Sequence, residues 1–523
     1  MIRFVLLLAV ALSLGACRLG PGHVRPEPEL PQSWRTTVDG SEEIANTPWW
    51  EQYNDPVLNE LIERALRDNL DVRIAAARIQ EYAARLAVAR GGLYPQIGYQ
   101  ADAATNYASV NTPFGAFPGI ERTTDDIFAA FTASWEIDVW GRLRSLTEAA
   151  RADLLSTVEG RRTVIMTLVS TVASSYIGLR GLDRQLEISN QTEASLAETV
   201  ELFKVKAAGG VISDLEVAQI ESEYERAAVR SVAVERQVGT AENAISVLLG
   251  SNPTDIPRGL ALNDFGVPIV PAGLPSTLLL RRPDIRAAEH DLASAGANVR
   301  AARAELYPTI SLTAAAGWAS QSLTNLLNSA SSTWNLAAGA AGPIFTGGRL
   351  EGQVNVSRAV QKQLLLTYLQ TVQQAFREVE DALIAIRKGR DQLAGQDRRV
   401  DRLEEYLRLA QMRYDEGIVS YIEVLDATRR LFDARLIQTQ TRAALDRSYV
   451  DAYKAMGGGW ICLAEAIAND AERGRPDPCL PRCLPPCPSP RPRDCGPVAR
   501  PACPPTTSFP PPPPPPPMPG DAE

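Results

Sequence analysis

Leu93-Tyr94-Pro95-Gln96-Ile97 returns later in the chain as Leu306-Tyr307-Pro308-Thr309-Ile310. The two copies are 213 residues apart, from 93 to 306, and each follows a helical pattern that starts at Asp71-Val72-Arg73 or at Asp284-Ile285-Arg286. A helix that ends in a proline-led strand is therefore predicted twice. Two copies at so long a period favour one internally pseudo-symmetric protomer over a solenoid, whose repeats are much shorter.

The repetition continues beyond these strands with a slightly shorter spacing. Gly141-Arg142-Leu143 returns as Gly348-Arg349-Leu350, and Gly210-Val211-Ile212-Ser213 returns as Gly417-Ile418-Val419-Ser420, both after 207 residues. The six-residue change lies between the matched strands, where the first copy has the longer loop, 108–125. The repeated elements lie on both sides of any cut near the middle of the chain. We therefore expect one elongated protomer with a tubular body.

Alternation of apolar and polar residues predicts four strands, at about 96–107, 126–138, 308–319 and 332–345. In the first, Ile97 and Tyr99 share a face opposite Gln96 and Gln100. Each segment is near the length that a tilted strand needs to cross a bilayer. A small soluble sheet with one buried face is the alternative. The export signal described below, and the lack of other apolar runs near 20 residues, favour a membrane barrel over that sheet.

Four strands cannot close a barrel, and an open edge in lipid leaves backbone donors and acceptors without partners. Closure therefore requires several chains. The smallest membrane barrels have about eight strands, so two copies are the minimum and three copies give twelve strands. The strand pattern does not choose between two and three.

Between the strands lie two long helical tracts, which we expect to form hairpins over about 142–249 and 349–456. The rising arm of each hairpin reaches roughly 100 Å at about 1.5 Å per residue. Gly210 and Gly417 interrupt the tracts and supply the backbone angles of the hairpin tips. The tips are thus predicted to lie far from the strands.

The N-terminus has the pattern of an export signal. Arg3 precedes an apolar run over 4–14, and Leu14-Gly15-Ala16 leads directly to Cys17. Small residues before a cysteine are similar to the lipobox of bacterial lipoproteins, and an ordinary signal peptide with a chance cysteine is the alternative. Acyl chains on Cys17 would anchor the mature chain. Arg18, rather than Asp, follows the cysteine and favours sorting to the outer membrane.

These patterns divide the chain into six parts. They are a signal peptide (1–16), a lipidated N-terminal tether (17–55), a first repeat (56–250), a linker (251–274), a second repeat (275–460) and a Cys- and Pro-rich tail (461–523). The tail contains an uninterrupted run from Pro510 to Pro517, for which an unpacked polyproline helix is the default. It would dock a partner or the cell wall, or have no role; we favour the last. The cysteine spacing does not indicate a zinc site.

Composition and motifs exclude several classes of function. A formal net charge of −9 argues against nucleic acid as a partner. The two histidines, His23 and His290, are far apart and without neighbours at metal-ligand spacing. Nothing resembles a nucleophile with its base or a phosphate-binding loop, so we expect no enzyme, no catalytic residue, no cofactor and no metal site.

Longer strings resemble a known family. Ser134-Trp135-Glu136-Ile137-Asp138-Val139-Trp140-Gly141-Arg142, Arg281-Arg282-Pro283-Asp284-Ile285-Arg286-Ala287-Ala288-Glu289 and Tyr453-Lys454-Ala455-Met456-Gly457-Gly458-Gly459-Trp460 are similar to TolC-like outer-membrane efflux proteins. With the lipobox, the chain resembles the NodT-type lipoprotein branch. The resemblance covers Cys17 to about Trp460.

The resemblance implies a mainly α homotrimer in which a twelve-stranded β-barrel in outer-membrane lipid continues as an α-helical barrel through the periplasm. It also implies two partners, which are a periplasmic adaptor protein that meets the helical tips and an inner-membrane resistance-nodulation-division transporter. The protein would then be a passive exit duct. Two alternatives are export of protein or lipo-oligosaccharide with an ATP-driven transporter, and a structural envelope lipoprotein that does not conduct.

The resemblance also assigns roles at the second hairpin tip. Ile422 matches an apolar constriction, Glu423 and Asp426 match acidic rings, and Arg429 belongs to the same gate. Arg413 and Tyr414 match latches to neighbouring helices. Glu423 and Asp426 are three residues apart and so share a helix face. Glu216 is the repeat counterpart of Glu423, and we hypothesise that it is the latch partner of Tyr414 or Arg413.

Overall fold

The computed structural model describes residues 25–26, 31, 33–36, 47–109, 111, 122–270 and 275–473. The chain divides into two units, Met1–Pro481 and Arg482–Glu523, and every described residue belongs to the first. The predicted signal peptide, Cys17 and residues 474–523 of the predicted tail lie outside the described residues. The expected start of the tail at 461 is wrong, because residues 461–473 belong to the helix Trp460–Arg473, and Ile461 and Ala464 of this helix are buried in the core.

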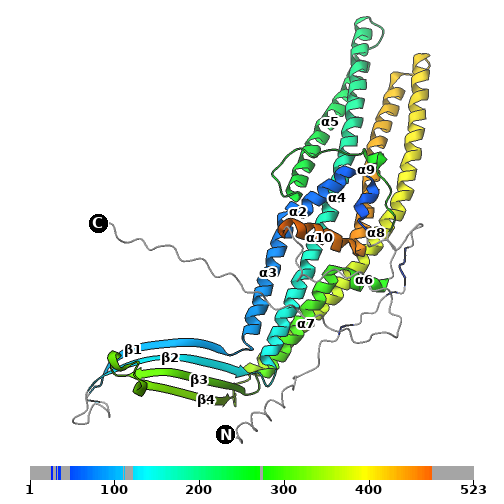
Figure 1. Cartoon of the computed structure of the whole chain (residues 1–523). Coiled ribbons are helices and arrows are strands. Elements are labelled where there is room, and N and C mark those ends of the chain that lie inside the picture. The colour runs from blue at the N-terminus through cyan, green and yellow to red at the C-terminus, as the bar shows by residue number, and fades with distance from the viewer. Residues whose placement is uncertain are drawn as a thin grey trace, which may run out of the picture. The chain divides into compact units, whose positions relative to one another are not determined.

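Two long helical hairpins contain the longest helices of the first unit (Figure 1). The first joins α4 (Arg142–Ala208) to α5 (Asp214–Leu248), and the second joins α8 (Arg349–Asp415) to α9 (Tyr421–Met456). Both α4 and α8 have 67 residues. The shorter helices are α2 (Pro56–Asp68), α3 (Leu70–Gly91), α6 (Pro275–Arg281), α7 (Pro283–Ala304) and α10 (Trp460–Arg473).

The strands form one antiparallel sheet in the order β1-β2-β3-β4, at the opposite end of α4 from its hairpin tip (Figure 1). Their bounds are β1 (Gln96–Tyr107), β2 (Thr123–Ile137), β3 (Thr309–Ser320) and β4 (Ser332–Ala341). We expected the last strand to reach residue 345, but it ends at Ala341. Pro343 lacks the N–H that a ladder hydrogen bond requires, which explains the earlier end. The mainly helical, duplicated protomer is confirmed.

The duplication extends to the pairing register of the sheet. Gln96 pairs with Ser134 between β1 and β2, and Thr309 pairs with Ala341 between β3 and β4. Thr309 lies 213 residues after Gln96, and Ala341 lies 207 residues after Ser134, which are the two spacings of the sequence repeat. The two hairpins of strands are therefore equivalent residue by residue.

A buried aromatic cluster, here called the central core, joins the two ends of the described chain. The Trp49 ring stacks on Tyr453 with ring centroids 5.4 Å apart and meets Trp460 edge-on at 6.0 Å. Trp49, Tyr453 and Trp460 have no exposed surface. Tyr53 donates a hydrogen bond from its hydroxyl to the main-chain oxygen of Asp446 at 2.7 Å. The short helix Trp49–Tyr53 and α10 thus close over α4 and α9.

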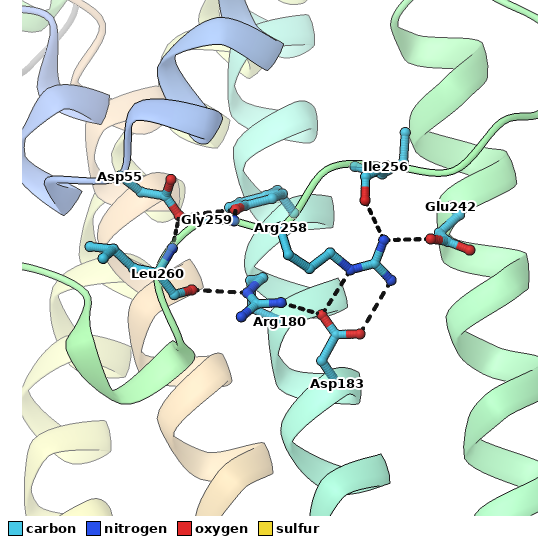
Figure 2. Close-up of polar contacts among 9 residues, drawn as sticks. Asp55, Arg180, Asp183, Glu242, Ile256, Arg258, Gly259 and Leu260 are labelled. Carbon is cyan, nitrogen blue, oxygen red and sulfur yellow. Dashed lines mark hydrogen bonds and ion pairs between the residues drawn. The ribbon is translucent and has the colours of Figure 1, made fainter.

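Asp55, at the edge of the central core, binds the segment between α5 and α6 to the body (Figure 2). Its Oδ1 accepts from the backbone N–H of Val57 at 2.9 Å, capping α2, and its Oδ2 accepts from the Tyr176 hydroxyl at 2.9 Å and from Leu260 N at 3.0 Å. The side chain is fully buried. Burial of a carboxylate is tolerated only with such partners. Gly259 is in contact with this carboxylate, and a Cβ added there would lie 2.0 Å from Asp55 Oδ1.

Arg258 connects the same segment to both arms of the first hairpin (Figure 2). Its guanidinium binds both carboxylate oxygens of Asp183 in α4, at 3.1 and 3.3 Å, and also pairs with Glu242 in α5. Arg180 reaches Asp183 at 2.6 Å and donates to the main-chain oxygen of Leu260 at 2.9 Å. The segment expected to be a simple linker is therefore held by ion pairs at a fixed place on the hairpin.

One described helix, α4, is long and apolar enough to be a candidate membrane span, with an 18-residue window of mean hydropathy 1.2. We expected no such helix after the signal. However, 61% of that window is buried within the protein. Val172, Tyr176 and Leu179 of α4 are fully buried in the central core. The apolar stretch is accounted for as the core helix of the body.

Candidate functional site at the hairpin tips

The two hairpin tips have the same backbone. Gly210 and Gly417 both have φ of +72°, a conformation that other residues resist. Each tip also closes with the hydrogen bond of a Schellman motif, from Val211 N to Lys206 O and from Ile418 N to Arg413 O, both 2.9 Å long. The two predicted tip glycines therefore terminate α4 and α8 in the same way, and the arms return from equivalent turns.

An aromatic cluster, here called the tip cluster, holds the two hairpins of one chain together beside these turns. The ring of Phe203 in α4 lies 4.4 Å from that of Tyr421 in α9, and the ring of Tyr414 in α8 lies 5.0 Å from Tyr421. The ammonium of Lys206 is 5.6 Å from the centre of the Phe203 ring and 5.7 Å from that of Tyr414. Phe203 is 1% exposed. The hairpins are thus attached through packed rings and a cation–π contact.

The predicted gate residues begin at the first turn of α9. Ile422 is 54% exposed, as an apolar constriction residue in a lone chain would be. Glu423 forms an ion pair with Arg413 at 3.4 Å. A predicted gate residue and a predicted latch residue therefore contact each other within one hairpin. Asp426 receives Arg429 at 3.0 Å and Arg430 at 2.7 Å. Both acidic side chains therefore hold arginines of their own hairpin.

The pKa of Asp426 reflects this setting. Desolvation raises the pKa, but the hydrogen bonds and charges of Arg430 and Arg429 outweigh desolvation, and the net pKa lies below its ordinary value. Asp426 is thus ionised at neutral pH. Tyr406 of α8 also donates to Asp426, at 3.4 Å. The Asp426 carboxylate therefore carries a negative charge and also links α9 to α8 through this hydrogen bond.

Within the described part of the chain, Glu216 forms its hydrogen bonds at the start of its own helix and not with the predicted latch residues Arg413 and Tyr414. Its carboxylate instead accepts from the backbone N–H of Ser213 at 3.0 Å and so completes a capping box at the start of α5. Arg413 pairs with Glu423, and the Tyr414 ring packs against Tyr421. A contact of Glu216 with either latch residue therefore requires a rearranged side chain or a second copy.

A groove of about 670 Å³ runs between α5 and α9 behind the tips. All four predicted gate residues line the groove from the side of α9; they are Ile422, Glu423, Asp426 and Arg429. The residues of α5 that line the opposite side are Ala218, Gln219, Ser222 and Glu223. The structure thus brings the gate residues to one surface. Among the described residues, no group of three or more His, Cys, Asp or Glu is placed to hold a metal ion.

Comparison with known proteins identifies the family of this architecture. Residues 61–251 and 274–458, which cover both repeats, match the family described as outer membrane efflux protein. The chain belongs to the outer membrane efflux protein family. The outer-membrane location and the role in efflux expected from the sequence are confirmed at this level. The family is one of transport proteins rather than enzymes.

Two relatives that are named for different cargoes align with most of this chain and with nearly all of their own length. The solvent efflux pump outer membrane protein SrpC of Pseudomonas putida is 36% identical over 86% of this chain and 97% of its own length. The cation efflux system protein CusC of Escherichia coli is 34% identical over 86% of this chain and 97% of its own length.

Solved structures of outer membrane efflux proteins have the same fold. A crystal structure of CusC superposes with a TM-score of 0.76 at 32% identity and covers 84% of this chain and all of the CusC chain. The open-state structure of the MtrE outer membrane channel of Neisseria gonorrhoeae superposes with a TM-score of 0.77 at 29% identity, over 85% and 98% of the two chains.

The sequence reasoning missed three members of the tip cluster, Phe203, Lys206 and Tyr421. One signal was available, because Lys206 is the repeat counterpart of Arg413, 207 residues later. Phe203 gives no such signal, since its counterpart is Ala410. An aromatic residue in a long helix packs against a core far more often than it marks a site, so only the folded structure distinguishes it.

Proposed function

We propose that three copies of this chain form the passive exit duct of an efflux pump. The open sheet carries the proposal. β1 and β4 are edge strands, and every residue of both is exposed in the single chain. In a bilayer such edges cost several kcal/mol for each unpaired group, so identical neighbours are needed to complete the wall. Three copies supply twelve strands, within the range of outer-membrane barrels.

The lipid anchor and the partners belong to the same proposal. Cys17 would be acylated and become the first residue of the mature chain. The hairpin tips expose apolar side chains, including Val205 at 70%, Val211 at 73% and Ile418 at 60%. A periplasmic adaptor would dock there and connect the duct to an inner-membrane resistance-nodulation-division transporter. Since relatives named for solvent and for cation efflux are about equally similar, we assign the choice of cargo to the transporter.

Native mass spectrometry and planar-bilayer recording of the detergent-extracted protein test the duct. We expect a trimer whose subunits begin at Cys17 with attached acyl chains, and a stepwise conductance. Cross-linked affinity capture from the cell should then retain an adaptor and its transporter. A single-subunit species that passes no ions would exclude the duct and leave the structural envelope lipoprotein. Capture of an ATP-driven transporter would instead support the rival export function.

The aperture is assigned to the tip of the second hairpin. Ile422 would form an apolar constriction, and three copies of Glu423 and Asp426 would gather around the axis as a cation-attracting ring. Arg429 and Arg413 would balance this charge while they are paired, as they are here with Asp426 and Glu423. Opening would then replace the ion pairs within a hairpin by new ion pairs. The contact between Tyr414 and Glu216 would be the latch that holds the closed state.

The latch is tested with Tyr414→Phe and Glu216→Gln, singly and together. We expect each to raise the conductance of the closed channel, and the double variant to add less than the sum because both remove one contact. Ser213→Ala is the matched control, since it weakens the same capping box without changing the latch charge. Unchanged closed-state conductance in the three latch variants would exclude Glu216 and Tyr414 as a latch.

A further inference from the structure

A second groove, of about 360 Å³, lies along α7, away from the hairpin tips. α7 packs against both α4 and α8 and leads directly into β3 (Figure 1). All three helices supply walls of this α7 groove. They include Asp153 from α4, Asp291 and Ser294 from α7, and Gln353 and Val356 from α8. The groove is therefore built by one chain and needs no second copy.

Two carboxylates of the α7 groove, those of Asp153 and Asp291, are left without a basic partner. Both residues are half-buried. Elsewhere on α4 a half-buried aspartate is paired, as Asp183 is with Arg180 and Arg258. Among the described residues, neither groove aspartate forms an ion pair with a lysine or an arginine. Their negative charge is therefore available to a ligand.

The pKa of Asp291 indicates that the two carboxylates are close to each other. Burial is the main cause that raises this pKa above its ordinary value, and the charge of Asp153 raises the pKa further. A hydrogen bond with Ser156 and the charge of His290 lower the pKa without reversing the shift. Like charges in one groove repel each other, and a cation bound beside them would remove that repulsion.

Ser294 adds a buried hydroxyl that has no partner in the described part of the chain. The residue is 5% exposed, and it lines the α7 groove. Other buried serines of the long helices, such as Ser170 and Ser189, donate to the carbonyl oxygen four residues earlier. Within the described residues Ser294 makes no such bond. A buried polar group without a partner is costly, and a ligand in the groove would supply the missing hydrogen bond.

The α8 wall of the groove is apolar. Val356, Val360 and Leu364 recur every fourth residue and so project from one face of α8. Val356 is 56% exposed and Val360 is 42% exposed. Ala295 of α7 continues this wall. The groove thus combines negative charge with apolar surface, and its volume is near the lower end of the range for small-molecule sites.

We propose that the α7 groove binds an organic ammonium ion whose apolar body is about the size of one aromatic ring. The ammonium would lie against the carboxylates of Asp153 and Asp291 and donate a hydrogen bond to the Ser294 hydroxyl oxygen. The apolar body would lie against Val356 and Val360. A calcium or magnesium ion is a poorer fit, because it prefers six or more oxygen ligands and no apolar wall. The ammonium ion would bind whether or not three copies form a duct.

Titration of the detergent-purified full-length protein with phenethylammonium, followed by saturation-transfer NMR, tests the site. Micelles without protein give the baseline for partition into detergent. The matched neutral probe is 2-phenylethanol, which has the same ring and chain and a hydroxyl in place of the ammonium. We expect phenethylammonium to bind about tenfold more tightly than 2-phenylethanol, because hydrogen bonds to charged groups are the stronger ones. Equal affinity for the two probes would overturn the proposal.

Variants then locate the binding site. Asp153→Asn and Asp291→Asn should each weaken phenethylammonium binding about tenfold, and Ser294→Ala should weaken it a few-fold without lowering the unfolding temperature. Asp401→Asn is the matched control, since Asp401 is an exposed aspartate of α8 outside the groove, and binding should not change. Val356→Lys places a positive charge at an exposed position of the groove and should abolish binding even if an aspartate variant does not fold. Wild-type affinity in the folded groove variants would exclude this groove as the cation site.

Discussion

Replacing Gly259 with alanine is expected to destabilise the protein by about 3 kcal/mol, since overpacking and damage to buried hydrogen bonds each cost about 1–3 kcal/mol. The added Cβ would lie 2.0 Å from Asp55 Oδ1 and 2.5 Å from the other carboxylate oxygen. Asp55 cannot move away freely, because it holds Val57, Tyr176 and Leu260 by hydrogen bonds. Either the segment shifts and Arg258 loses its ion pairs, or the cap of α2 breaks.

Thermal unfolding of the purified protein and its yield in the outer membrane measure this effect. Gly239→Ala is the matched control, since Gly239 is inside α5 and a Cβ there meets nothing within 4 Å. In a helix interior that change is expected to be neutral or to stabilise by about 0.5–1 kcal/mol. If Gly259→Ala unfolds at the wild-type temperature, the tight contact with Asp55 is not a constraint on the fold.

Phe203→Ala is expected to detach the two hairpins of a chain at their tips. Truncation of a buried phenylalanine costs about 3–5 kcal/mol, and the Phe203 ring of α4 packs against Tyr421 of α9. Lys206 would also lose one of its two rings. Because the central core lies far along α4 from the tip, we expect local loosening and not global unfolding. Under the proposed function, the closed channel would conduct several-fold more current.

Two measurements separate the structural and the functional parts of the Phe203 prediction. Hydrogen exchange should become faster around residues 410–425 and remain unchanged at the central core, whatever the channel does. Bilayer recording then reports the aperture. Leu202→Ala is the control, because Leu202 is the preceding residue and is 52% exposed. Unchanged exchange at the tip in Phe203→Ala would show that the tip cluster does not hold the hairpins.

Periodicity and repetition were sufficient to predict the fold, because long helices and alternating strands leave local patterns. The first strand was expected at 96–107, and β1 spans Gln96–Tyr107. The tip turns were also predictable, since Gly210 and Gly417 are repeated and few residues other than glycine adopt their backbone angles. Where the pattern was weak, as beyond Ala341, the expected strand was too long.

The contacts that fix the body could not be predicted in the same way. Asp55 binds Leu260, 205 residues away, and Tyr176, 121 residues away. No local period encodes such a partner, and an aspartate before Pro56 is explained well enough as a helix cap. The ion pairs of Asp426 were missed for another reason. The resemblance assigned Asp426 to an acidic ring, and that role does not specify its ion pairs with Arg429 and Arg430.

The central core has a consequence for biogenesis. Gln52 and Tyr453, which are hydrogen-bonded at 3.0 Å, are 401 residues apart in the sequence. Contacts of such separation form late, since the intervening chain must first be ordered. With the predicted N-terminal export signal, Trp49 and Trp50 would be exposed to the periplasm until α10 has been translocated. Chaperones and proteases would encounter these tryptophans throughout export. Arrest of translation before Trp460 would leave a chain that cannot complete its central core.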